Sequence, residues 1–241
     1  MPSTEPPLAW PPAQGIVTLT REHLEEGLIR RLASARPGAA RCLADAELDA
    51  SIASLLAEYC PQCDIWVFAY GSLIWNPLFR YAERHPVRLD GYHRRFCLWS
   101  MTGRGTPDAP GLVLGLDRGG RCKGLAYRIS RGDAAEELRL LWRREMVVGS
   151  YSPRWVDLVD ARSRRIRGIA FIVNRSHPHY AGRLSTERIA QVMSAARGVI
   201  GANAEYLRKT VHGLAEHGIH DPHLAELHAR LFGADAERDQ R

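Results

Sequence analysis

The sequence predicts an α+β fold in which helices flank a small mixed sheet or barrel, with a helical extension at the N-terminal end. The chain has 241 residues, of which 45% are hydrophobic and 25% charged, and a chain of this size and composition can bury a full core. Apolar segments of strand length gather between residues 64 and 173, and segments with helical spacing precede, interrupt and follow them. This order, with helices among the strands and then after them, is typical of the α+β class.

The extension is expected to comprise residues 1–60. It begins with a Pro-rich arm over residues 1–15. Thr20 is a suitable N-cap for a helix over residues 21–34, because its hydroxyl can accept a hydrogen bond from a backbone N–H group of the first turn. A second helix is expected over residues 45–59, where apolar side chains recur at helical spacing.

Residues 61–241 are expected to form one further domain. Residues 65–69 are all apolar, as in a strand that is buried on both faces. Further strands are expected at residues 93–99, 111–117, 122–130, 154–160 and 166–173.

Glycines are expected to mark the connections between elements. Asp90-Gly91 and Gly119-Gly120 have the residue types of tight turns, so we expect them between strands. Helices are expected at residues 133–147, 185–197, 202–217 and 222–232. Gly218 stands where a helix-ending glycine belongs, and Asp221-Pro222 offers an N-cap followed by a first-turn proline.

The charge pattern favours a small acidic substrate over a nucleic acid. The net charge is +6, and Lys123 and Lys209 are the only lysines among 33 basic residues. The arginines are scattered and not gathered in a stripe with aromatic residues, so the sequence does not indicate a nucleic-acid interface. A modest positive potential can still steer anions toward a cleft.

The sequence predicts neither a membrane span nor export. No run of 18 apolar residues is present, so we expect no membrane-spanning helix. The first residues have neither the basic start nor the apolar stretch of a secretory signal. We therefore expect a cytoplasmic location, where the five cysteines stay reduced.

Tyr70-Gly71-Ser72-Leu73, called the 70–73 loop below, follows directly after the predicted buried strand. Gly71 lets the backbone come close to a ligand, and Tyr70 and Ser72 add hydroxyl groups. Backbone N–H groups in such a turn can bind an anion, although a plain strand-ending turn explains the same four residues. Ser72 does not fit a hydrolase nucleophile, because position 74 is Ile where that motif needs Gly.

Glu145 is the second candidate, because the helix over residues 133–147 sends it toward the core. Apolar residues lie at offsets 0, 4, 7 and 8 from Ala134, and Glu145 is the next residue on that stripe. Glu136, Arg139, Arg143 and Arg144 are expected to point elsewhere. Burial raises the pKa of a carboxyl group, as a general base near neutral pH requires. A buried Glu paired with an Arg, or one at a frayed helix end, are the alternatives.

Two groups of potential metal ligands give weaker patterns. Cys60 and Cys63 form a C-x-x-C pair, but they precede a strand instead of beginning a helix, and no second ligand pair is present. His217, His220 and His223 lie around Gly218 and Pro222 and do not share one helical face. We expect no metal site, and no glycine-rich nucleotide loop is present.

Residues 66–75, WVFAYGSLIW, resemble the signature of the ChaC-like gamma-glutamylcyclotransferases, a family that degrades glutathione. Further matching segments follow in the family's order at residues 91–96, 124–128, 144–145, 149–151, 203–207 and 218–221. The resemblance covers about residues 64–232. It departs from the family's usual pattern at Ala69 and Ser150, where glycine is common.

The resemblance implies a compact barrel-like sheet with flanking helices and a cyclisation reaction without a cofactor or metal. The α-amine of a γ-glutamyl group attacks its own side-chain amide, so that 5-oxoproline forms and Cys-Gly leaves when the substrate is glutathione. The resemblance implies that Glu145 acts first as general base and then as general acid. It also implies that the 70–73 loop and Tyr151 bind the substrate. Glu136 is given only a supporting role.

Two alternatives remain open at this point. The first is the same cyclisation on another γ-glutamyl amine or dipeptide. The second is a regulatory module that binds γ-glutamyl compounds without catalysis. The sequence does not predict the oligomeric state.

Overall fold

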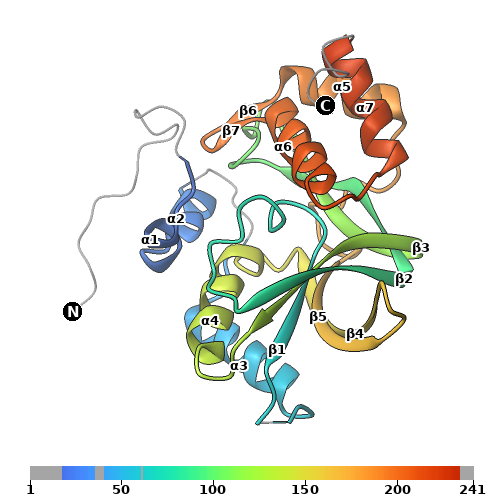
Figure 1. Ribbon diagram of the computed structural model, residues 1–241. Coiled ribbons are helices and arrows are strands. Elements are labelled where there is room, and N and C mark those ends of the chain that lie inside the picture. The colour runs from blue at the N-terminus through green and yellow to red at the C-terminus, as the bar shows by residue number, and fades with distance from the viewer. Residues whose placement is uncertain (1–17, 36–40, 61, 234–241) are drawn as a thin grey trace.

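The computed structural model describes residues 18–35, 41–60 and 62–233, so the predicted arm over residues 1–15 lies outside it. Five strands form a closed barrel in the order β1-β3-β2-β4-β5 (Figure 1). Its strands are β1 (Ile65–Ala69), β2 (Glu83–Ser100), β3 (Gly111–Ile129), β4 (Tyr151–Asp160) and β5 (Arg165–Val173). β1 pairs antiparallel with β3 and parallel with β5, which makes the barrel mixed and closes it. The predicted fold class is confirmed.

Two strands are much longer than predicted. The predicted strands at residues 111–117 and 122–130 are parts of one 19-residue strand, β3. The predicted strand at residues 93–99 is only the second half of the 18-residue strand β2. β2 and β3 pair along nearly their whole length as one antiparallel ribbon.

The glycines expected to connect strands lie instead inside this ribbon. The register shifts between Asp90 and Tyr92, opposite Gly119 and Gly120. The φ angles are 84° at Gly91, 95° at Gly119 and 73° at Gly120, all in the region that favours glycine. The prediction of turns was wrong, because the same residue types form a bulge at which both strands bend and continue.

The N-terminal extension contains three short helices, α1 (Arg21–Glu25), α2 (Leu28–Ser34) and α3 (Asp45–Leu56). The helix predicted over residues 21–34 is interrupted at Gly27, whose φ of 72° is not helical. The predicted cap is confirmed, since the Thr20 hydroxyl accepts a hydrogen bond from the backbone N–H of His23.

Four helices of the remaining chain match the predicted positions; the first three are shorter than predicted, and the fourth has the predicted bounds. They are α4 (Ala134–Glu145), α5 (Thr186–Ala195), α6 (Asn203–Ala215) and α7 (Pro222–Phe232). A two-stranded sheet, β6 (Arg197–Gly198) and β7 (Gly201–Ala202), connects α5 with α6. The signals before α7 are confirmed: Gly218 has a φ of 65°, and the Asp221 side chain accepts from the backbone N–H of Leu224.

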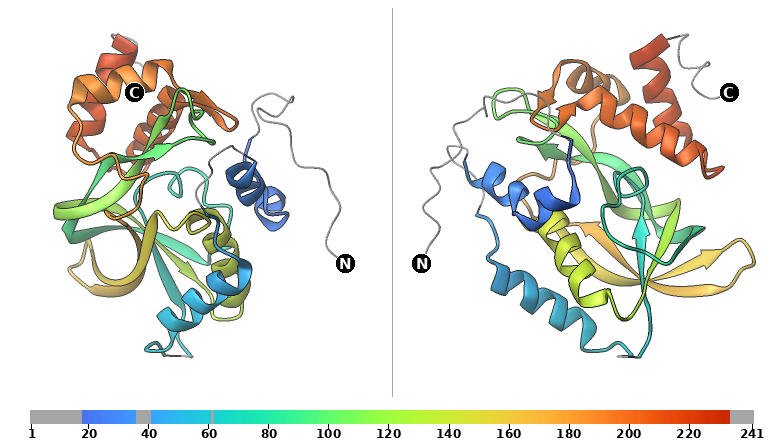
Figure 2. Two further views of the ribbon diagram at one scale, coloured as in Figure 1. Left: turned by 180° about the vertical axis from the view of Figure 1, so that it is seen from behind. Right: turned by 60° about the vertical axis from the view of Figure 1, so that its left-hand side comes forward.

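The helices form two groups around the barrel. Figures 1 and 2 show α5, α6 and α7 together at one end, and α1 to α4 against another side. One apolar core joins the barrel interior to both groups, and it includes Leu24 of α1 and Leu48 of α3. The division of the chain at residue 60 stays a prediction. Within the described residues, no helix is both long and apolar enough to cross a membrane.

Candidate active site

The 70–73 loop leaves the barrel at the end of β1 and is fixed by buried hydrogen bonds. The Tyr70 hydroxyl donates to the Phe171 carbonyl of β5 over 2.8 Å. The Arg94 guanidinium donates to the Tyr70 carbonyl over 2.7 Å, and its Nε lies 2.9 Å from a carboxylate oxygen of Asp221. A β-carbon at Gly71 would lie 3.1 Å from the Tyr206 hydroxyl, so glycine permits a close approach here. The loop is therefore held rigidly.

Glu145 ends α4 and faces the loop. A cavity of about 20 Å³ brings together every site residue predicted from the sequence, and its lining comprises Tyr70, Gly71, Ser72, Leu73, Leu114, Glu145, Tyr151, Phe171 and Tyr206. The Glu145 side chain is only 15% exposed. Burial raises its pKa above the ordinary Glu value, and Arg144 opposes part of that effect.

The helical pattern predicted that Arg144 points away from the site, and this prediction was wrong. Its side chain is 7% exposed, and its Nε lies 3.1 Å from a Glu145 carboxylate oxygen. It also donates to the Ser72 hydroxyl over 3.0 Å and to the Asn76 carbonyl over 2.5 Å. The prediction failed because helical spacing places the β-carbon, whereas a long arginine side chain at a helix end can reach around that end. Arg144 thus connects the carboxyl group to the loop.

Three tyrosines line the same cavity as the carboxyl group: Tyr70 and Tyr206 are buried, and Tyr151 is partly buried. The Tyr151 hydroxyl donates to the Leu114 carbonyl over 2.9 Å. Burial raises the pKa of Tyr70 and Tyr151 well above the ordinary value, and it raises the pKa of Tyr206 to about 12. All three phenols are therefore neutral at physiological pH and can donate hydrogen bonds. Tyr206 was not singled out from the sequence, although it lies in the 203–207 segment that carried part of the resemblance.

A larger cavity of about 310 Å³ adjoins the small one and shares Ser72, Glu145, Tyr151 and Tyr206 with it. This volume is in the range of small-molecule sites. Aromatic and charged side chains line it, among them Trp75, Trp99, Arg104, Glu205 and Lys209. The site can therefore hold a molecule that reaches from the loop into a wider, partly cationic space.

Arg104 is a buried cation that lines only the larger cavity. The residue is 7% exposed, and its guanidinium lies 5.5 Å from the ring centre of Tyr206 and 5.8 Å from that of Trp75. Burial lowers its pKa. Sequence reasoning missed this residue. The glycines on either side, Gly103 and Gly105, could have indicated a closely packed segment around Arg104. A β-carbon at either position would come within 2.7 Å of a neighbouring atom.

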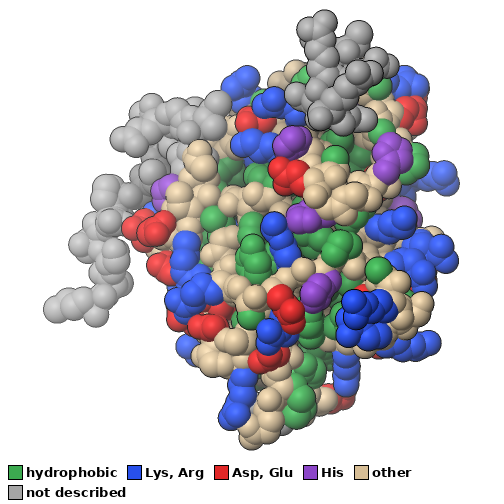
Figure 3. Space-filling model, viewed as in Figure 1, with side chains coloured by type: hydrophobic (Ala, Val, Ile, Leu, Met, Phe, Trp, Pro, Cys, Tyr) green, Lys and Arg blue, Asp and Glu red, His purple; other side chains and the backbone are tan. Residues whose placement is uncertain are grey.

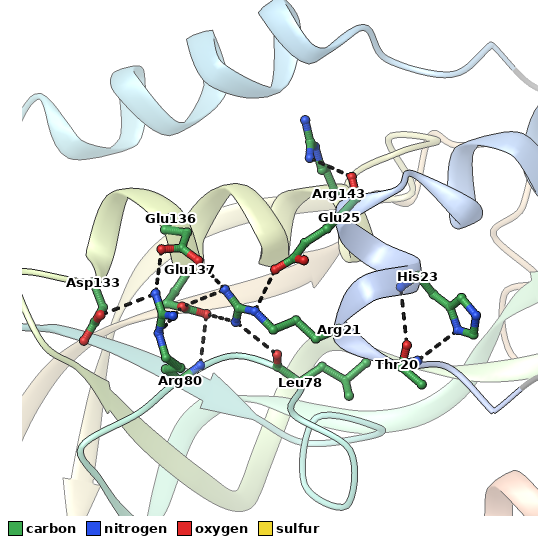
Figure 4. A network of polar contacts seen from close by, with 10 residues as sticks. All are labelled: Thr20, Arg21, His23, Glu25, Leu78, Arg80, Asp133, Glu136, Glu137 and Arg143. Carbon is green, nitrogen blue, oxygen red and sulfur yellow. Dashed lines mark hydrogen bonds and ion pairs between the residues drawn. The ribbon is translucent and has the colours of Figure 1, made fainter. Parts of the chain in front are cut away.

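Glu136 lies outside both cavities. Its side chain is 59% exposed and pairs with Arg21 and Arg80. The next residue, Glu137, is fully buried and was also missed; it binds the same two arginines, at 2.7 Å and 2.9 Å (Figure 4). The expected supporting role of Glu136 in the site has no basis in this geometry.

The cysteine and histidine patterns do not form a metal site in the described part of the chain. Cys60 and Cys63 are exposed free thiols. No group of three or more His, Cys, Asp or Glu side chains there could hold a metal ion.

The barrel, its flanking helices and the position of the cavity define a gamma-glutamylcyclotransferase-like fold. A solved structure described as a gamma-glutamyl cyclotransferase specific to glutathione from yeast superposes with a TM-score of 0.65. The two sequences are 24% identical, and the superposition covers 70% of this chain and 95% of the yeast chain. This similarity shows the fold.

The chain belongs to the ChaC-like protein family, whose model matches residues 65–232. A "Glutathione-specific gamma-glutamylcyclotransferase" of Escherichia coli is 40% identical over 178 residues, which are 74% of this chain and 77% of that protein. A "Glutathione-specific gamma-glutamylcyclotransferase 1" of Danio rerio is 32% identical over 71% of this chain and 90% of that protein. By this homology the chain is an enzyme of the gamma-glutamylcyclotransferase class.

Proposed function

We propose that this enzyme degrades glutathione by cyclising its γ-glutamyl group, with Glu145 as general base and acid. The observation that carries the proposal is the desolvated Glu145 carboxyl group, which lies in one cavity with the 70–73 loop. The names of the relatives support glutathione as the substrate.

The reaction joins two atoms of the same substrate. The α-amino nitrogen bonds to the γ-carbonyl carbon, the amide C–N bond breaks, and 5-oxoproline and Cys-Gly separate. Because nucleophile and electrophile belong to one molecule, this chemistry requires no enzyme nucleophile, metal or cofactor. The enzyme must fold the extended γ-glutamyl chain until the two atoms meet, and positioning of this kind can lower a barrier by several kcal/mol.

Glu145 handles the proton. The α-amine is an ammonium ion near neutral pH and cannot attack until it loses a proton. The Glu145 carboxylate takes this proton and returns one to the leaving nitrogen as the C–N bond breaks. A raised pKa suits both steps, because the group exchanges a proton more readily near neutral pH than an ordinary glutamate does.

The 70–73 loop and Arg144 stabilise negative charge on the substrate. The γ-carbonyl oxygen becomes an oxyanion as the ring closes, and backbone N–H groups of the rigid loop stabilise it. The α-carboxylate of the substrate binds at the same loop, where Arg144 already contacts Ser72. Tyr151 borders the same space.

The larger cavity receives the leaving half of the substrate. Cys-Gly ends in a carboxylate, and Arg104 presents a buried cation to this cavity. A guanidinium in a site that excludes water binds a carboxylate strongly through paired hydrogen bonds.

Replacement of Glu145 tests the proposal. The purified wild-type protein should convert glutathione to 5-oxoproline and Cys-Gly, measured by chromatography. Glu145→Gln should lower kcat by about 10²- to 10⁴-fold, because it removes the proton acceptor and keeps the shape. Glu136→Gln is the matched control on the same helix and should keep near-full activity, because Glu136 lies outside both cavities.

Other outcomes would decide between the alternatives. Near-full activity of Glu145→Gln would refute the assigned base. Turnover of other γ-glutamyl compounds but not of glutathione would change the substrate, and binding without any product would indicate a regulatory module.

A further inference from the structure

We propose that helix α2 and the short segment just before α1 form a specificity wall, which selects the side chain that follows the γ-glutamyl group. The inference rests on the proposed function and extends it to a part of the chain outside residues 65–232, the segment that the family model matches. The specificity wall consists of Thr18, Leu19, Ile29 and Ala33, all of which line the 310 Å³ cavity.

The specificity wall borders the larger cavity and not the smaller one. None of its four residues lines the small cavity that holds the 70–73 loop. A substrate whose γ-glutamyl end lies at that loop therefore presents its other half to the specificity wall. Ile29 and Ala33 are one helical turn apart on α2, so they present one continuous surface. Leu19, Ile29 and Ala33 make this surface mainly apolar.

An ion pair and a hydrogen bond to the backbone hold this segment against the helix that carries Glu145. Arg21 of α1 contacts both carboxylate oxygens of the buried Glu137 of α4, at 2.7 Å and 3.0 Å (Figure 4). Arg143, also of α4, donates to the Glu25 carbonyl over 3.2 Å. The specificity wall thus has a fixed position relative to α4.

A second attachment joins the segment to the chain just after the 70–73 loop. The Asn76 side-chain amide donates to the Leu19 carbonyl over 3.3 Å. The Asn76 carbonyl in turn accepts from Arg144, which also contacts Ser72. Asn76 therefore connects the specificity wall to Arg144 in the reaction centre.

The chemistry of the larger cavity indicates which leaving groups fit. An apolar wall and the Arg104 cation line the same space. A dipeptide with a small side chain and a terminal carboxylate satisfies both, because the side chain packs on the wall while the carboxylate faces the cation. A bulky second side chain would collide with Ile29. The specificity wall therefore sets an upper size for that side chain.

Two variants that change the wall in opposite directions test this inference. The probes are glutathione and γ-Glu-Leu-Gly, which differ only in the second side chain, and the readout is the ratio of their kcat/KM values. Ile29→Ala enlarges the cavity and should shift the ratio toward γ-Glu-Leu-Gly by roughly tenfold. Ala33→Val narrows it and should shift the ratio toward glutathione. Ile52→Ala is the control, since Ile52 is partly buried on α3 against the same core but lines neither cavity.

Each outcome separates the inference from the function on which it rests. If the wild-type enzyme forms no 5-oxoproline from glutathione, the proposed function fails. If it does, and both wall variants keep the wild-type ratio, the specificity wall is refuted while the function stands. If Ile29→Ala does not fold, Ala33→Val decides alone, because an unchanged or reversed ratio would overturn the inference.

Discussion

At the scale of single residues, the site depends on a balance at one carboxyl group. Burial favours the neutral form of Glu145, whereas the Arg144 guanidinium 3.1 Å away favours the charged form. Burial has the larger effect, so the pKa stays above the ordinary value. Sequence reasoning anticipated the burial from the apolar stripe of the helix. It did not anticipate the cation, because adjacent residues normally point in different directions from a helix.

This balance predicts how activity depends on pH. Glu145 can accept a proton only as a carboxylate, so activity should fall as the pH drops through its raised pKa. Arg144→Gln removes the charge that lowers this pKa, so the pKa should rise further and the acid limb of kcat/KM should move to higher pH. The measurement is the pH profile with glutathione. Arg143→Gln should leave the acid limb in place, because Arg143 pairs with Asp45 and not with Glu145. An unmoved limb in Arg144→Gln would contradict the balance.

At the scale of elements, the sequence predicted the features that depend on neighbouring residues. It did not predict pairings between residues that are far apart in the sequence. The β1 strand, the four later helices and the caps at Thr20 and Asp221 were predictable because each depends on a few neighbouring residues. The continuity of β2 and β3 was not predictable, because the same glycine-containing sequence is compatible with a turn and with a bulge. Glu137 was missed for the same reason, because its partner Arg21 is 116 residues away.

The contact between Arg21 and Glu137 predicts a specific effect on stability. Arg21→Ala leaves the fully buried Glu137 with Arg80 as its remaining cationic partner. Loss of one partner of a buried ion pair is strongly destabilising, and Arg80 moderates the effect. We expect unfolding to require about 1–3 kcal/mol less free energy, measured by urea denaturation.

A surface ion pair on the same helix provides the control. Arg139 is 63% exposed and pairs with Asp49, so Arg139→Ala should cost about 0–1 kcal/mol. Arg21→Ala should also raise KM for glutathione, because Arg21 anchors the segment whose residues Leu19 and Ile29 line the larger cavity. Equal stability losses in the two variants would mean that burial of Glu137 adds nothing.

At the scale of the whole molecule, most charged side chains are exposed, and only a few are buried. Lys and Arg side chains are spread over the face in Figure 3, with Asp and Glu among them. Inside, a few buried carboxylates join distant segments. Asp117 of β3 is fully buried and binds the Tyr180 hydroxyl at 2.8 Å and Arg175 at 2.6 Å, both beyond the end of β5. This cluster connects the long β2–β3 ribbon to the chain that leaves the barrel.

The Asp117 cluster predicts how the stability of the whole fold changes with pH. Burial alone would raise the pKa of Asp117, but hydrogen bonds from Tyr180, the Arg118 backbone and Arg175 outweigh it and lower the pKa below the ordinary Asp value. A group with a lowered folded-state pKa binds protons more readily when unfolded. Its stabilising effect is therefore complete at neutral pH and is lost as the pH falls below about 4.

Asp117→Asn removes this titration and keeps the shape of the side chain. The variant should be less stable than the wild type at pH 7, by about 1–3 kcal/mol, because Arg175 loses its charged partner. The difference between the two proteins should shrink as the pH falls toward 3, where Asp117 of the wild type also becomes neutral. Urea unfolding at several pH values measures both quantities. A difference that stays constant over this range would show that the charge of Asp117 does not stabilise the barrel.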